Sequence, residues 1–220
     1  PDEKLVEVLL TARAARTRGA RHSTLVAPYT AYMRQDIAVA PGEVVSQQVV
    51  GAFLAGLVDA VVTVDPHLHR VATLQEAMAV PQAIVLSGAE PLADLIAQRN
   101  PNALLVGPDG ESAQWIAQAA ARHGFDHAVC TKVRHGDRDV TIELPPLHAQ
   151  GRAVVLLDDM ASTGRTLAQA ARLLRAAGAA SVDVAVTHAL CAGDALQALH
   201  DAGVGEVWST DCIPNASNAV

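Results

Sequence analysis

The sequence predicts an α/β fold in which parallel sheets are flanked by helices. Half of the 220 residues are apolar, and most of these are small: there are 43 Ala and 27 Val, against two each of Phe, Trp and Tyr. Short continuous apolar runs, typical of strands buried on both faces, alternate with Ala-rich segments of helical periodicity. Charged residues are scattered evenly and make up 18% of the chain, which argues against disorder.

The first third of the chain opens with a helix at 4–19, predicted by apolar residues at helical spacing and ended by Gly19. An apolar run at 23–28, broken by Pro28, predicts the first strand. The alternation then continues, with helices expected at 43–58 and 74–78 and strands at 60–65 and 83–86.

The rest of the chain repeats the same alternation, apart from a polar stretch at 132–139 that has the composition of a solvated loop. Helices are expected at 90–98, 112–123, 165–177 and 194–202, and strands at 103–107, 127–131, 140–143, 153–157, 181–187 and 206–209. Ligands of such folds bind beyond the carboxyl ends of the strands, so the residues that follow each strand are the candidates for chemistry.

Several classes of protein are excluded by composition. The net charge of −7 without a basic run argues against nucleic-acid binding. Every apolar run is shorter than a membrane-spanning helix requires, and no signal peptide opens the chain, so a soluble cytoplasmic protein is expected. Cys130, Cys191 and Cys212 have neither the number of a disulfide framework nor the spacing of a zinc site.

The strongest chemical signal lies at 154–167, where an apolar strand brings Asp158 and Asp159 to its carboxyl end. The following turn and the start of the next helix offer hydroxyl and backbone N–H groups that suit an anion: Ser162, Thr163, Gly164, Arg165 and Thr166. Two carboxylates beside such an anion cradle suit a sugar phosphate, usually with Mg²⁺ close by. The segment could also be only the end of a strand followed by an ordinary helix cap. That interpretation does not account for the two adjacent acidic residues, Asp158 and Asp159. The loop is not a Walker A loop, because the chain contains no Gly-x4-Gly-Lys-Ser/Thr pattern.

This segment resembles the phosphoribosyl pyrophosphate (PRPP) motif shared by phosphoribosyltransferases and ribose-phosphate diphosphokinases. Other segments resemble the diphosphokinases, most closely their archaeal-type class, and the match runs from about residue 5 to the C-terminus. In chain order they are Arg34-Gln35-Asp36, Asp65-Pro66-His67, Gly107-Pro108-Asp109-Gly110, Lys132-Val133-Arg134, Thr187-His188 with Gly193, and Thr210-Asp211. The transferases have no counterpart of the first of these.

The resemblance implies two similar phosphoribosyltransferase-like domains, at 1–82 and 83–220, of which the first is incomplete because the chain begins part-way through it. A seam near 79–82 is compatible with this division. It also implies a cytoplasmic homo-oligomer that converts ATP and ribose 5-phosphate into PRPP and AMP, with Mg²⁺ as the metal.

The resemblance further implies a role for each site residue. Lys132 and Arg134 are expected to be catalytic, and His67 and Asp109 to contact Mg²⁺. Arg34, Gln35, Asp36 and His67 are expected on the ATP side, with His69 a bystander. The sugar phosphate is expected to contact Asp158, Asp159, Ser162, Thr163, Gly164, Arg165 and Thr166.

Two departures from the family pattern leave alternatives open. Ile37 and Ala38 stand where basic residues are usual, and Arg165 stands where Gly is usual, so Arg165 either adds a phosphate contact or obstructs the ribose. The leading hypothesis is a diphosphokinase. The alternative is a weakly active homologue that senses PRPP or nucleotide, and a PRPP-consuming transferase is less favoured.

Overall fold

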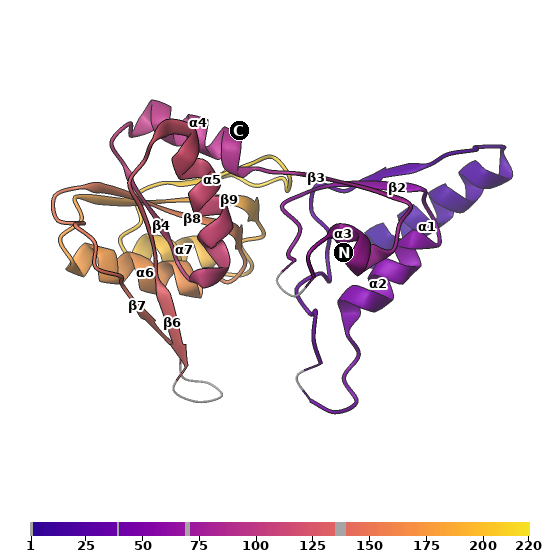
Figure 1. The fold of residues 1–220 in the computed structure, drawn as a ribbon, viewed down its shortest axis with the longest axis horizontal. Coiled ribbons are helices and arrows are strands. Elements are labelled where there is room, and N and C mark those ends of the chain that lie inside the picture. The colour runs from indigo at the N-terminus through magenta and orange to yellow at the C-terminus, as the bar shows by residue number, and fades with distance from the viewer. Residues whose placement is uncertain (1, 39, 69–70, 135–139) are drawn as a thin grey trace. The chain divides into compact units, whose positions relative to one another are not determined.

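The computed structural model describes residues 2–38, 40–68, 71–134 and 140–220. His69 and residues 135–139 of the polar stretch therefore lie outside the described residues. The chain forms two compact units, Pro1–Ser87 and Gly88–Val220, each with its own parallel sheet (Figure 1).

The first unit has a three-stranded parallel sheet in the order β1-β2-β3. Its strands are β1 (Thr24–Val26), β2 (Ala60–Val64) and β3 (Gln82–Leu86). Its helices are α1 (Asp2–Thr17), α2 (Ser46–Ala55) and α3 (Leu74–Met78). The short helix α3 is set by a capping box: Thr73 Oγ1 accepts from the Glu76 N–H, and Glu76 Oε2 accepts from the Ala72 N–H.

One face of this sheet packs against the three helices. Val61 of β2 is fully buried there among side chains that include Leu54 of α2 and Met78 of α3. The opposite face carries Val26 and Leu86, which are 67% and 52% exposed. Because β3 pairs with β2, this strand belongs to the first unit, which ends at Ser87, while the expected division into domains at 1–82 and 83–220 stays a prediction.

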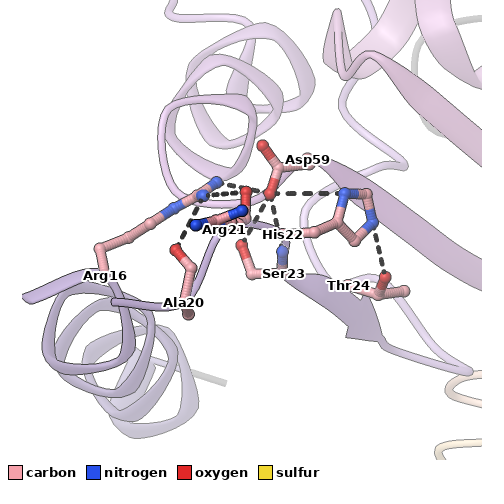
Figure 2. Close-up of polar contacts among 7 residues, drawn as sticks. All are labelled: Arg16, Ala20, Arg21, His22, Ser23, Thr24 and Asp59. Carbon is pink, nitrogen blue, oxygen red and sulfur yellow. Dashed lines mark hydrogen bonds and ion pairs between the residues drawn. The ribbon is translucent and has the colours of Figure 1, made fainter. Parts of the chain in front are cut away.

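Asp59 ties three elements of the first unit together (Figure 2). Its Oδ2 pairs with the Arg16 guanidinium at the end of α1 and accepts from the Ser23 N–H at 2.7 Å, just before β1. The Asp59 N–H in turn donates to the Ser23 carbonyl at 2.9 Å. The hydrogen bonds from Arg16 and Ser23 lower the pKa of Asp59 from 3.8 to about 2.

The second unit has a five-stranded parallel sheet in the order β10-β9-β8-β4-β5. Its strands are β4 (Leu104–Gly107), β5 (His127–Val129), β8 (Ala153–Ala161), β9 (Ser181–Ala189) and β10 (Val207–Ser209). Its α-helices are α4 (Ala89–Arg99), α5 (Ala113–His123), α6 (Arg165–Ala176) and α7 (Ala195–Asp201).

Helices cover both faces of this sheet, as the continuous apolar strands predict (Figure 1). Alternate residues of β8 face opposite layers: Val154 and Leu156 pack with α6 and α7, whereas Val155 and Leu157 pack with α4 and α5. All four side chains are at most 1% exposed, so β8 is the centre of the fold.

Two elements differ from those expected. Residues of the polar stretch form β6 (Thr131–Arg134), which pairs in antiparallel register with β7 (Val140–Glu143). Strand β8 continues to Ala161, because its pairing with β9 extends to Ala161↔Ala189. Asp158 and Asp159 therefore lie inside the strand rather than after it.

Within the described part of the chain, no helix has both the length and the apolar character needed to cross a bilayer.

We expect Asp59→Asn to lower the melting temperature and to change its pH dependence. The carboxyl titrates near pH 2 when folded and near pH 3.8 when unfolded, so its stabilising contribution is present above pH 3.8 and is lost as the pH falls toward 2. Thermal melts followed by circular dichroism between pH 6 and pH 2 should thus show the two proteins converging at the acid end.

The matched control is Glu7→Gln on α1, whose carboxylate pairs with Lys4 with both side chains mostly exposed. Exposed pairs of this kind contribute little, so this variant should follow the wild type. A constant gap between wild type and Asp59→Asn across the whole pH range would contradict the assignment.

Candidate functional site

The two acidic residues of β8 lie beside each other near the end of the central strand. Asp159 is buried, with 7% exposed, and Asp158 is half-buried. The Asp159 N–H donates to Asp158 Oδ1 at 3.0 Å. Burial raises the pKa of Asp158 well above its usual value, and the charges of Asp159 and Asp109 raise it further. The fold therefore brings three carboxylates close enough for their charges to interact.

Asp109 is fixed by the tight turn that follows β4. A Cβ on Gly107 would lie 2.2 Å from Ser112 Oγ, so only glycine fits at this position. That Ser112 hydroxyl donates to the Asp109 carbonyl at 2.6 Å. Asp109 Oδ1 accepts from the Glu111 N–H at 3.0 Å and caps a short 3₁₀ turn, Gly110–Ser112. The remaining carboxylate oxygen, Oδ2, is held beside the end of the sheet.

Lys132 reaches this carboxylate from β6. The Cys130 N–H donates to the Gly107 carbonyl at 2.8 Å, which anchors the start of β6 to the end of β4. Lys132 Nζ then lies 3.6 Å from Asp109 Oδ2. Burial and the nearby Asp109 charge raise the pKa of the Cys130 thiol to about 11. Arg134 is the last residue of β6, and its side chain lies outside the described part of the chain.

The anion cradle predicted from the sequence connects β8 to α6. Gly164 has a positive φ of 69° and precedes Arg165, the first residue of α6. A neighbouring loop supports this turn, because the Ala192 N–H donates to the Ser162 carbonyl at 2.9 Å. Thr163 and Arg165 are exposed, whereas Ser162 and Thr166 are half-buried.

The helix end beside this cradle is open. No side chain among the described residues caps the N-terminus of α6, and its first turn contains no acidic residue. Unpaired N–H groups at a helix N-terminus favour an anion. The Arg165 guanidinium has no ion pair or hydrogen bond to any described residue.

The residues expected on the ATP side all belong to the first unit. Arg34 and Gln35 are exposed and Asp36 is half-buried. The Gln47 N–H at the start of α2 donates to the Gln35 carbonyl at 3.2 Å, which holds this segment. His67 is half-buried and follows β2 by way of the buried Asp65.

Asp65 opens the Asp65-Pro66-His67 segment, and its backbone conformation was not expected from the sequence. Its φ is +35°, which is strained for a residue other than glycine, and its N–H donates to the Leu86 carbonyl at 2.9 Å. The supporting roles of Ser112 and Ala192 were also missed. Gly107 and Gly193 were the available signals, since Gly107 ends β4 and Gly193 lies in the loop that follows β9.

The carboxylates of the second unit fit a hard divalent cation. The described residues form no cluster of three or more metal-binding side chains that would hold an ion by themselves. Mg²⁺ does not require one, because it is usually held by one or two carboxylates together with water and substrate phosphates. Asp109, whose Oδ2 lies 3.6 Å from Lys132 Nζ and whose charge acts on Asp158, meets that lesser requirement.

Comparisons with known proteins identify the family of this chain. A family model described as "Phosphoribosyl transferase domain" matches residues 81–211, and one described as "N-terminal domain of ribose phosphate pyrophosphokinase" matches residues 1–57. The chain is 38% identical over 216 residues to a ribose-phosphate pyrophosphokinase of Methanopyrus kandleri, covering 97% of this chain and 73% of that protein. It is 36% identical over 214 residues to ribose-phosphate pyrophosphokinase 1 of Archaeoglobus fulgidus, with the same coverage.

The fold leads to the same group of proteins. The structure of phosphoribosylpyrophosphate synthetase from Mycobacterium smegmatis matches with a TM-score of 0.81 and 26% identity, over 96% of this chain and 68% of that one. The expected fold class, α/β with parallel sheets of the phosphoribosyltransferase type, is confirmed. The chain belongs to the ribose-phosphate pyrophosphokinase family.

Proposed function

We propose that this protein is itself a ribose-phosphate pyrophosphokinase. It moves the β,γ-pyrophosphoryl group of ATP to the 1-hydroxyl of ribose 5-phosphate and forms PRPP and AMP. The observation that carries the proposal is the placement of Lys132 beside Asp109, whose charge in turn acts on Asp158 in the strand that leads into the anion cradle. The 38% identity over 97% of the chain supports this reading.

The sugar phosphate binds along the end of β8. Asp158 and Asp159 accept hydrogen bonds from the ribose hydroxyls. The open N-terminus of α6 and the residues of the cradle bind the 5-phosphate: Ser162, Thr163, Gly164, Arg165 and Thr166. This arrangement directs the 1-hydroxyl away from the cradle, toward the incoming nucleotide.

The reaction forms a bond between ribose O1 and the β-phosphorus. It breaks the bond from that phosphorus to the oxygen that stays with AMP, and the hydroxyl proton is lost. Lys132 and Arg134 stabilise the charge that develops on the transferred group. We propose Mg²⁺ as the metal, with Asp109 in the second unit and His67 in the first as residues that would contact it, and a bound Mg²⁺ would neutralise phosphate charge. Arg34, Gln35, Asp36 and His67 contact ATP.

Three further features remain part of the proposal. The two units correspond to two phosphoribosyltransferase-like domains, the protein works as a homo-oligomer, and it acts in the cytoplasm.

The deciding experiment measures AMP and PRPP formation from ATP, ribose 5-phosphate and Mg²⁺. We expect the wild type to be active and Lys132→Ala to lower turnover by about a hundredfold or more, because a positioned cation is removed from the transferring group. Ribose 5-phosphate binding, measured by calorimetry, should survive this change.

Lys4→Ala, on the exposed surface of α1, is the control and should retain turnover. A wild type that binds PRPP tightly but never forms it would reject the kinase and support the sensor. The exposed Ile37 and Ala38 beside Asp36 are the residues that favour this alternative.

We expect Asp158→Asn to change thermal stability and ribose 5-phosphate affinity in opposite directions. The fold disfavours the charged form of Asp158, so the neutral amide should raise the melting temperature of the ligand-free protein. The same change should weaken ribose 5-phosphate binding roughly tenfold, because a charged acceptor for the hydroxyls is lost. Calorimetry and thermal melts test the two effects.

Asp183→Asn is the matched control. Burial also raises the pKa of Asp183, but this residue lies near the opposite end of β9, where it accepts from the Glu206 N–H. It should leave sugar-phosphate affinity unchanged. Equal effects of the two variants on affinity would remove Asp158 from the site.

We expect Arg165→Gln to weaken ribose 5-phosphate binding roughly tenfold, since a charge-assisted phosphate contact is lost. Arg172→Gln is its control: it is equally exposed and lies on nearly the same face of α6, but about 10 Å farther from the helix N-terminus. Tighter binding by Arg165→Gln would show that this side chain obstructs the ribose.

A further inference from the structure

The contact between Lys132 and Asp109 joins a proposed catalytic cation to a proposed ligand of the metal. We infer that the Lys132 ammonium and a divalent cation compete for the Asp109 carboxylate, so that the lysine is released toward the reacting phosphates only when the cation binds. The role of the released lysine at the reacting phosphates rests on the proposed function. The competition itself requires neither ATP nor ribose 5-phosphate.

The geometry leaves Asp109 one oxygen for this purpose. Oδ1 accepts from the Glu111 N–H at 3.0 Å and holds the turn, while Oδ2 lies 3.6 Å from Lys132 Nζ. The Asp109 side chain is only 10% exposed, and that of Lys132 is 34% exposed. The carboxylate is therefore fixed, and the lysine is the partner that can move.

The surrounding charges favour a second cation at this place. The charges of Asp109 and Asp159 both raise the pKa of Asp158, so the three carboxylates together create a negative potential that attracts a cation. A divalent cation bound to Oδ2 would place its charge within a few ångströms of Nζ. Like charges at such a separation repel, and the more exposed side chain is the one that leaves.

The sequence provides an internal control for testing this exchange, because the chain contains only two lysines, Lys4 and Lys132. Lys4 pairs with Glu7 on the exposed surface of α1, in the other unit. An amine-directed probe therefore gives one lysine signal from the site and one lysine reference signal, besides the signal of the α-amino group.

The test is a Mg²⁺ titration of protein whose lysines are reductively dimethylated with ¹³C, a modification that keeps the charge. Without any substrate, Mg²⁺ should shift the Lys132 methyl signal to saturation and leave the Lys4 signal in place. Lys132→Gln assigns the signals. Asp109→Asn should shift the Lys132 signal before Mg²⁺ is added and abolish its response, whereas Glu111→Gln, in the same turn, should preserve the response.

A second measurement on unlabelled protein uses Mn²⁺ binding followed by electron paramagnetic resonance. Lys132→Gln removes the competing ammonium and should tighten Mn²⁺ binding roughly threefold or more, and Lys4→Gln should not change it. This comparison decides the matter even if Asp109→Asn fails to fold, although Asn is a good cap for the turn.

The inference is overturned if Mg²⁺ saturates the protein without moving the Lys132 signal, or if Lys132→Gln binds Mn²⁺ no better than the wild type. An inactive wild type with both expected results would reject the kinase and leave the competition standing.

Discussion

The parallel pairing of β8 with β4 is the constraint on which the second unit depends. The register Leu104↔Val154 to Val106↔Leu156 brings the end of β4 level with the residues just before Asp158 and Asp159 of β8. Side chains that are far apart in the chain, the turn carrying Asp109 and the acids of β8, are therefore brought to one edge of the sheet. In the same register, alternate residues of β8 pack against two different layers of helices. Their burial in those layers stabilises the pairing of the strands. Packing and chemistry thus depend on one set of backbone hydrogen bonds.

Much of this arrangement was predictable from the sequence. Strands buried on both faces give continuous apolar runs, and the step from an apolar strand through acids and hydroxyls to a helix at Arg165 is typical of an anion-binding loop. The sequence predicted strand β7 of the β6–β7 hairpin but indicated a loop for most of β6. Lys132 and Arg134 give β6 a polar pattern that also suits a loop. The contact of Lys132 with Asp109 depends on tertiary structure, and no local pattern encodes it.

The end of β3 shows a second limit of sequence reasoning. The apolar composition of the strand at 82–86 would suit the sheet of either unit. Only its pairing with β2 assigns the strand to the first unit. The site itself works against stability, since three carboxylates and an uncapped helix with Arg165 at its first position are each unfavourable without a ligand. Local rules are commonly broken in this way where a protein binds charged molecules.

Cys130 has a consequence for how the protein tolerates oxidants. Its thiol is 1% exposed and its pKa is raised to about 11, so at neutral pH roughly one molecule in ten thousand carries the thiolate. Peroxides and alkylating reagents attack the thiolate, and they need access to it. A sulfur atom two residues from Lys132 is therefore protected from reagents that modify exposed cysteines.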